Sequence, residues 1–385
     1  MRSVAVKRKD FLCYLFNYAM LLTLLSANVV GAAALCTTAT PECTEWITVA
    51  GGPSRSMVYR SHALQTRNEG ITRALVIVHG GSRDAHTNFL HTLAAAFIAG
   101  ALNNTLIVSP RFASNHEAIA KTLTGEDAVA AARAPARDTL ADNELNWVSQ
   151  FGGRHWNAGG VASNAKITSY EVIDEIQRKL ADKNVFPNIK SIVVAGHSSG
   201  GQFVGRYQMV NRVHEQLGVK ATYIVSNPGA YTYLDNQRPT ASAIPPNVSA
   251  SVPGFIDMST AKPPPYRPYA DAQHCKTYDT WPYGMKDRVG YAAQFPDQPL
   301  IKQAVSRPTT FVLGELDILP LVNFDISCPA MSQGNSRLAR GLAFSRYIRD
   351  NFGAKHPTVV LDGCGHSTRC MLTHDRMLPI LFPKE

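Results

Sequence analysis

Residues 191–201 decide the fold, and they read Ser-Ile-Val-Val-Ala-Gly-His-Ser-Ser-Gly-Gly. The first five form an almost entirely apolar run, which is typical of a strand buried on both faces of a sheet. The Gly196-x-Ser198-x-Gly200 spacing places a serine on a tight turn from strand to helix, where side chains two positions away would clash with neighbouring backbone. Such a turn lifts the hydroxyl to the positive end of a helix. We therefore predict that Ser198 is a nucleophile; the alternative is a glycine-rich turn with a purely structural purpose.

Strand-like and helical segments alternate on both sides of this turn. Strands are predicted at 74–78, 105–108, 191–195, 222–225, 310–313 and 358–361, and helices at 89–101, 168–181, 200–217 and 337–351. Strands separated by helices imply an α/β fold with a mostly parallel, doubly wound sheet and helices on both faces. The length of 385 residues suffices for one large domain of this kind.

The stretch 228–306 interrupts the alternation and is rich in proline and aromatic residues, including Pro263-Pro264-Pro265 and Trp281. A segment this long without regular structure is usually functional or ordered by its own packing. We predict that it forms a cap over an active site. Its aromatic residues have a second explanation, as a small core of the insertion itself.

A serine hydroxyl is a weak nucleophile that needs a base, and the base needs an acid to orient it. His366 lies in a glycine-rich loop directly after the last predicted strand and is the predicted base. Asp317 follows the strand at 310–313 and is the predicted acid, with Glu315 and Asp325 as its rivals.

Acyl transfer also needs N–H donors where the carbonyl oxygen becomes an oxyanion. The backbone N–H of Ser199 supplies the first. The second is expected from the loop at 79–82, His-Gly-Gly-Ser, with Gly81 as first choice; the alternative is that the glycine pair only makes a turn. The side chain of His197 is expected to point away from the serine hydroxyl.

The first 34 residues are predicted to be a secretory signal peptide. Basic residues precede an uncharged run from Phe11 to Leu35 that ends in the small residues at 31–34, and this pattern favours cleavage near Ala34. Cleavage predicts a secreted or periplasmic protein with no stable membrane insertion. The alternative is a retained N-terminal anchor, because about twenty apolar residues can also span a bilayer.

Six cysteines follow the predicted cleavage site, and an even number in an oxidising compartment predicts three disulfides. They are Cys36, Cys43, Cys275, Cys328, Cys364 and Cys370. The close pairs 36/43 and 364/370 are favoured, which leaves 275 with 328. Since no C-x-x-C or H-E-x-x-H spacing occurs, we predict no metal site.

The net charge of +9 does not indicate a nucleic-acid partner. The first ten residues carry +3 of it, which leaves +6 for the rest of the chain. That is a mildly basic surface without a basic cluster, so no nucleic-acid binding is expected. The sequence leaves the oligomeric state open.

Four motifs in order resemble the α/β-hydrolase superfamily of serine esterases, lipases and related acyl hydrolases. They are HGG at 79–81, GHSSGG at 196–201, GELD at 314–317 and GCGH at 363–366, and the resemblance spans about residues 70 to 375. The predicted signal, the HGG loop and the Ser-Ser-Gly-Gly turn are similar to secreted polyester depolymerases and feruloyl-esterase-like enzymes.

The resemblance implies a cofactor-free enzyme that hydrolyses small or polymeric carboxylic esters through an acyl-enzyme on Ser198. A peptidase, amidase or acyltransferase would use the same triad. The non-enzyme alternative is a catalytically inactive hydrolase-fold binding module, and such modules usually lose one of the three triad residues.

Overall fold

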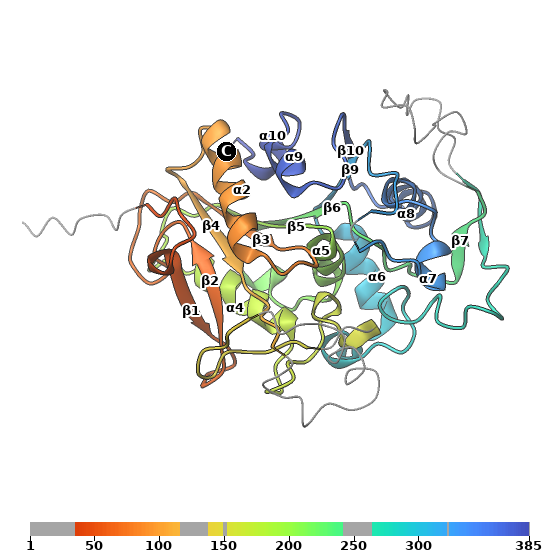
Figure 1. Ribbon diagram of the computed structural model, residues 1–385, viewed down its shortest axis with the longest axis horizontal. Helices are drawn as coiled ribbons and strands as arrows, with labels where there is room; N and C mark the ends of the chain where they lie inside the picture. The colour runs from red at the N-terminus through yellow and green to blue at the C-terminus, as the bar shows by residue number, and fades with distance from the viewer. Residues whose placement is uncertain (1–34, 116–137, 149–151, 242–263, 322, 385) are drawn as a thin grey trace, which may run out of the picture. The chain divides into compact units, whose positions relative to one another are not determined.

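The computed structural model describes residues 35–115, 138–148, 152–241, 264–321 and 323–384 (Figure 1). The predicted signal peptide, residues 1–34, lies outside these ranges, and so does part of the predicted cap, residues 242–263. Within the described ranges, every helix is too short or too polar to cross a bilayer.

A sheet of eight strands forms the centre of residues 35–384, in the order β1-β2-β4-β3-β5-β6-β9-β10. All neighbours from β4 to β10 are parallel, whereas β1 and β2 join antiparallel. The strands are β1 (Thr44–Thr48), β2 (Arg55–Arg60), β3 (Arg73–Val78), β4 (Thr105–Pro110), β5 (Ser191–His197), β6 (Lys220–Ser226), β9 (Thr309–Gly314) and β10 (Thr358–Leu361). The predicted mostly parallel sheet is confirmed, and each of the six predicted strands is present.

Strands β1 and β2 are missing from the sequence prediction. They form one side of the sheet, and their side chains are largely half-buried instead of continuously buried. Such short amphipathic runs, with Arg55 and Arg60 at the ends of β2, give a weaker signal than a continuous apolar run.

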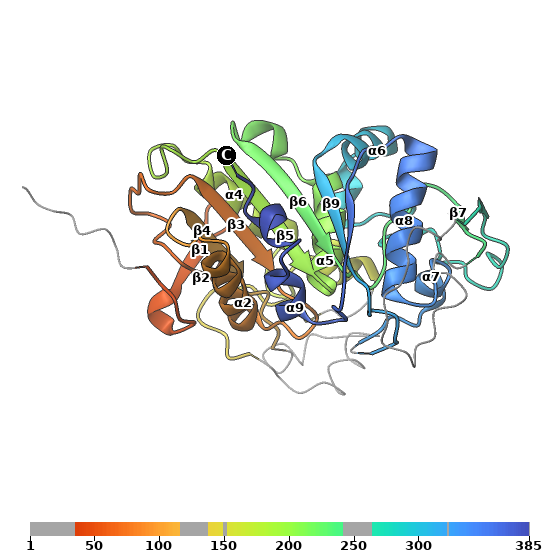
Figure 2. The same ribbon diagram turned by 90° about the horizontal axis from the view of Figure 1, so that it is seen from above.

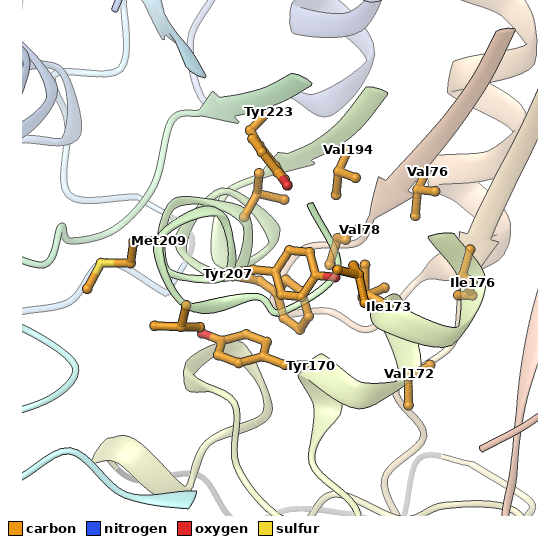
Figure 3. Close-up of a cluster of buried hydrophobic side chains, with 14 of the residues drawn as sticks. Val76, Val78, Tyr170, Val172, Ile173, Ile176, Val194, Tyr207, Met209 and Tyr223 are labelled. Atoms are coloured by element: carbon orange, nitrogen blue, oxygen red, sulfur yellow. The ribbon is translucent and has the colours of Figure 1, made fainter. Parts of the chain in front are cut away.

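Helices cover both faces of the sheet (Figure 2). One face carries α4 (Ser169–Leu180), α5 (Ser199–Val210), α6 (Asp297–Ser306) and α8 (Arg337–Phe352), and the other carries α2 (Ala85–Ile98), α9 (Thr368–Thr373) and α10 (Leu378–Leu381). Val76 and Val194 pack into the core beneath the first group, which Figure 3 shows. Leu75 and Val193 pack into the core beneath the second. Burial on both faces explains why these strands are apolar at every position.

Helix α5 ends at Val210, short of the predicted end at 217. Asn211 has an extended backbone, and its Nδ2 donates to the Tyr207 carbonyl at 3.0 Å. A side chain that satisfies the last turn in this way competes with continuation of the helix. The other predicted helices correspond to α2, α4 and α8 within a few residues.

The insertion connects β6 to β9. Its described part contains the short antiparallel strands β7 (Gln237–Pro239) and β8 (Tyr266–Pro268), the 3-10 helix η7 (Gly290–Gln294) and α6. Leu300 and Ala304 of α6 are buried in the core that α5 shares, so residues 297–306 belong to the helical layer on that face. Trp281 and Tyr291 are buried in the same core, so these aromatic residues pack into the main core of the domain and do not form a separate small core of the insertion. The covering of an active site by the remainder stays a prediction.

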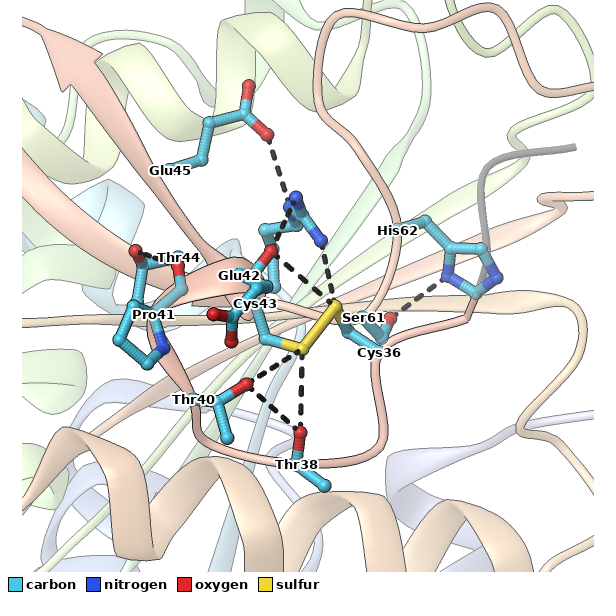
Figure 4. The surroundings of a disulfide bond; sticks show 11 residues. Cys36, Thr38, Thr40, Pro41, Glu42, Cys43, Thr44, Glu45, Ser61 and His62 are labelled. Atoms are coloured by element: carbon cyan, nitrogen blue, oxygen red, sulfur yellow. Dashed lines mark hydrogen bonds and ion pairs between the residues drawn. A yellow bond between two sulfur atoms is a disulfide. The ribbon is translucent and has the colours of Figure 1, made fainter.

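The six cysteines form the pairs Cys36–Cys43, Cys275–Cys328 and Cys364–Cys370, as the sequence favoured. Figure 4 shows the first pair, with the hydroxyls of Thr38 and Thr40 beside Cys43 Sγ. The second joins the insertion to the short helix α7 (Cys328–Met331). The third lies in the segment that carries His366.

We expect the Cys275–Cys328 bond to stabilise the protein more than Cys36–Cys43 does. The Cys275–Cys328 bond closes a loop with a sequence separation of 53, and the Cys36–Cys43 bond closes one of 7. From the loop-closure entropy of the unfolded chain, we expect stabilisation of about 4 kcal/mol and about 2.5 kcal/mol, respectively. Replacing each pair by two serines, followed by urea unfolding, measures the difference. An equal or larger loss for the 36/43 pair would contradict this expectation.

Candidate active site

Ser198 sits on a sharp turn between β5 and α5, as the G-x-S-x-G spacing predicts. Its backbone has φ 59° and ψ −122°, a conformation that side-chain-bearing residues rarely adopt. A Cβ on Gly196 would lie 2.2 Å from the Gly200 carbonyl oxygen, and one on Gly200 would lie 2.1 Å from the Val78 carbonyl oxygen. Both positions therefore require glycine, and the turn holds the hydroxyl of Ser198 above the end of the strand.

The structure brings Ser198, His366 and Asp317 into one chain of hydrogen bonds. The distance from His366 Nε2 to Ser198 Oγ is 2.9 Å, and from His366 Nδ1 to Asp317 Oδ2 it is 2.7 Å. Because an ionised carboxylate only accepts, Nδ1 carries the proton and Nε2 is free to accept from the serine hydroxyl. This is the tautomer that a general base needs.

The two rival carboxylates have other partners. Glu315 is buried, and its Oε2 accepts from the Gly363 N–H at 3.0 Å. Asp325 accepts from the Tyr283 hydroxyl at 2.7 Å and from the Ser327 hydroxyl at 2.6 Å. Asp317 is the carboxylate that meets the imidazole.

The buried carboxylate of Asp317 also meets a buried cation. Arg337 Nη1 lies 3.4 Å from Asp317 Oδ1, and both side chains are 1% exposed. The same Nη1 donates to the Leu321 carbonyl at 2.9 Å. A buried charge without a partner is costly, and the ion pair gives each of these two side chains a partner of opposite charge. No sequence pattern predicted this pairing.

Asn227, directly after β6, ties the loops of the acid and the base together. Its Oδ1 accepts from the Gly314 N–H at 2.7 Å, and its Nδ2 donates to the Gly365 carbonyl at 3.3 Å. Its φ of 41° is positive, which is uncommon for a residue other than glycine. Sequence reasoning missed Asn227; its position just beyond a parallel strand was the one available signal.

The His-Gly-Gly loop lies against the turn that carries the serine. A Cβ on Gly80 would be 3.6 Å from Ser198 Cβ, and one on Gly81 would be 3.2 Å from Ser199 Oγ. The loop therefore lies beside Ser198 and Ser199. The oxyanion role of the Gly81 and Ser199 N–H groups stays a prediction.

His79 fixes the shape of this loop from within the core. Its Nε2 accepts from the Phe112 N–H at 3.2 Å, so its Nδ1 carries the proton and donates to the Gly80 carbonyl at 2.9 Å. Burial lowers the pKa of His79 to about 4. The ring is therefore neutral at pH 7.

Within the residues that the structure describes, no group of three or more His, Cys, Asp or Glu side chains is placed to hold a metal ion.

The hydrogen-bonded chain of Ser198, His366 and Asp317 is an arrangement that can activate a serine hydroxyl for acyl transfer.

No family model and no curated protein matches the sequence. The structure is similar to a poly(3-hydroxybutyrate) depolymerase from Bordetella parapertussis, at 17% identity and a TM-score of 0.51, over 86% of this chain and 84% of that one. Poly(aspartic acid) hydrolase-1 from Sphingomonas sp. KT-1 aligns at 18% identity and a TM-score of 0.49, over 85% and 95%. The first similarity, together with the mostly parallel sheet and its helices on both faces, shows that the chain has the α/β-hydrolase fold.

Replacing Asp317 by asparagine is expected to lower kcat for p-nitrophenyl acetate by roughly 10⁴-fold, because an amide favours the wrong tautomer of His366. Glu315→Gln is the matched control: it makes the same carboxylate-to-amide change and keeps an oxygen for the Gly363 N–H. It should leave kcat close to wild type. A larger loss from Glu315→Gln would show that the acid is Glu315.

Acidification is expected to destabilise the fold through His79. Its pKa in the folded state lies below the unfolded value, so the stabilisation is complete above about pH 6.5 and is lost as the pH falls toward 4. For this one group, the free energy of unfolding should drop by about 2 kcal/mol between pH 7 and pH 5. Urea unfolding at both values, with His79→Gln as comparison, measures it. A wild-type pH dependence no steeper than that of His79→Gln would contradict the assignment.

Proposed function

We propose that this protein is a secreted serine hydrolase that cleaves carboxylic esters through Ser198, His366 and Asp317. One observation carries the proposal: the unbroken hydrogen-bond chain from Ser198 Oγ through His366 to Asp317, at 2.9 and 2.7 Å, on a strained turn of the α/β-hydrolase fold. Sequence motif, chain order and geometry agree on the same three residues.

In the proposed first step, Ser198 Oγ attacks the ester carbonyl carbon while His366 Nε2 takes the hydroxyl proton. Asp317 holds the imidazolium that forms, and the N–H groups of Gly81 and Ser199 bind the oxyanion. His366 then gives its proton to the departing alcohol, which leaves an acyl group on Ser198.

In the second step, His366 deprotonates a water molecule that attacks the acyl-enzyme. The tetrahedral intermediate collapses, the carboxylic acid leaves, and Ser198 recovers its proton. Each proton moves through Nε2, while Nδ1 stays hydrogen-bonded to Asp317 throughout.

The triad argues for an enzyme over an inactive binding module, because its three side chains are present and aligned. Amide hydrolysis and acyl transfer to another alcohol use the same residues, so substrates have to separate these activities. A poly(3-hydroxybutyrate) oligomer belongs among the substrates tested, because one protein of similar fold is a depolymerase of that polyester.

Export is part of the proposal. The charge and hydropathy pattern of residues 1–34 supports a cleaved signal peptide, and three disulfides are compatible with an oxidising compartment.

Ser198→Ala is expected to lower kcat for p-nitrophenyl esters by on the order of 10⁶-fold, because no other group can form the acyl-enzyme. The panel varies the acyl chain from two carbons upward and includes p-nitroanilides and the polyester oligomer. Ser345→Ala is a control, since that hydroxyl lies on α8 and donates to the Leu342 carbonyl. Full activity of Ser198→Ala on any substrate would refute the assigned nucleophile, and faster turnover of anilides than of matched esters would favour the amidase.

A further inference from the structure

His197 is the last residue of β5 and lies beside the proposed nucleophile. Val193 and Ala195 of the same strand belong to the core beneath α2 and α9, and His197 shares their side of the strand because side chains alternate. Its side chain is buried, with the residue 3% exposed. Figure 2 shows α9 on this side of β5.

The imidazole of His197 packs directly on the ring of His366. The two ring centroids are 4.7 Å apart, at an interplanar angle of 38°. His197 Nδ1 also lies 2.9 Å from Oγ1 of Thr368, the first residue of α9. His197 thus touches the proposed base itself and the segment that follows it. The sequence predicted only that this side chain points away from the serine hydroxyl, and it gave no indication of the contact with His366.

One nitrogen of His197 has no hydrogen bond. Within the described ranges, His197 Nε2 is buried without a partner. The less costly arrangement has Nδ1–H donating to Thr368, which leaves only an acceptor lone pair of Nε2 unsatisfied. An apolar side chain of similar size would fill this space without that cost, so simple core filling does not account for a histidine here.

The ring of His197 is neutral while His366 changes its charge. The titratable and charged groups that face it are His366 in the loop before α9, Arg337 on α8 and His91 on α2. Burial, reinforced by these groups, lowers the pKa of His197 well below its ordinary value. The imidazolium that forms at His366 therefore packs on a neutral ring at His197.

We propose that His197 is a positioning residue for His366: its ring, held by Thr368, supports one face of the base and keeps Nε2 aimed at Ser198. The inference rests on the proposed function, since it takes His366 as the base. It assigns His197 no proton and no bond to substrate. A ring that packs on the base restricts its rotation, and small displacements of a base cost large factors in rate.

The test uses a fluorophosphonate, whose phosphorus is attacked by the activated serine oxygen as fluoride leaves. The probe reads the reactivity of Ser198 without knowledge of the natural substrate. The second-order rate is measured on the high-pH plateau, where His366 is neutral, so that a loss reports alignment and not protonation. The variants are His197→Ala, His197→Phe and His197→Gln, each checked by its thermal unfolding midpoint.

We expect His197→Ala to react about 10²-fold more slowly than wild type. His197→Phe, which restores a ring but no hydrogen bond, should recover most of the rate. His197→Gln, which keeps polar atoms but no ring, should not. If His197→Ala does not fold, the comparison between Phe and Gln carries the test.

A wild-type rate for His197→Ala, or equal rates for the Phe and Gln variants, would overturn the proposal. Failure of the proposed function has a different signature: the wild-type protein would itself be inert toward the probe. The two failures are therefore distinguishable in one experiment.

Discussion

The site depends on how closely backbone segments approach one another at Ser198. The Val78 carbonyl stands where Gly200 would carry a side chain, and the Gly200 carbonyl stands where Gly196 would. Holding Ser198 at positive φ costs about 1–3 kcal/mol, and such strain persists when the surroundings over-determine it. Here the Ser198 N–H donates to the Ser226 carbonyl at 3.0 Å, which ties the turn to the neighbouring strand. The direction of the hydroxyl is therefore fixed by the buried sheet.

A parallel sheet then places the remaining components at the same edge. Gly81 follows β3, Ser198 follows β5, Asp317 follows β9 and His366 follows β10, so each stands just beyond the carboxyl end of its strand. These residues are far apart in the chain; Ser198 and His366 have a sequence separation of 168. Asn227, just beyond β6, bonds to both the acid loop and the base loop. The register of the parallel strands places these residues at one edge of the sheet, and the amide side chain of Asn227 links the loops that carry Asp317 and His366.

The parts that could be predicted from sequence are those with local causes. Continuous apolar runs predicted the central strands because both faces of the sheet are covered, and the spacing of glycines around Ser198 predicted the turn because backbone crowding requires them. Position after the strand favoured Asp317 as the partner of His366 but left Glu315 as a rival. Both follow β9, and the choice is made by the turn in which the Asp317 N–H donates to the Gly314 carbonyl at 3.2 Å. The ion pair of Arg337 with Asp317 could not be predicted from local sequence, because it forms only when α8 packs beside the loop that carries Asp317.

The insertion contributes to the site through the loop that carries the acid. Asp317 forms an ion pair with Arg337, and Asp325, which lies between them in the sequence, accepts a hydrogen bond from the Tyr283 hydroxyl of the insertion. The Cys275–Cys328 disulfide adds a covalent link between the insertion and the segment between Asp317 and Arg337. An insertion that supplies none of the three side chains of the proposed triad therefore still helps to hold the carboxylate of Asp317 beside His366. A shift of about 1 Å in a catalytic group can cost roughly 10²-fold in rate. The alignment of the proposed triad therefore depends on how the insertion packs against the segment that follows Asp317.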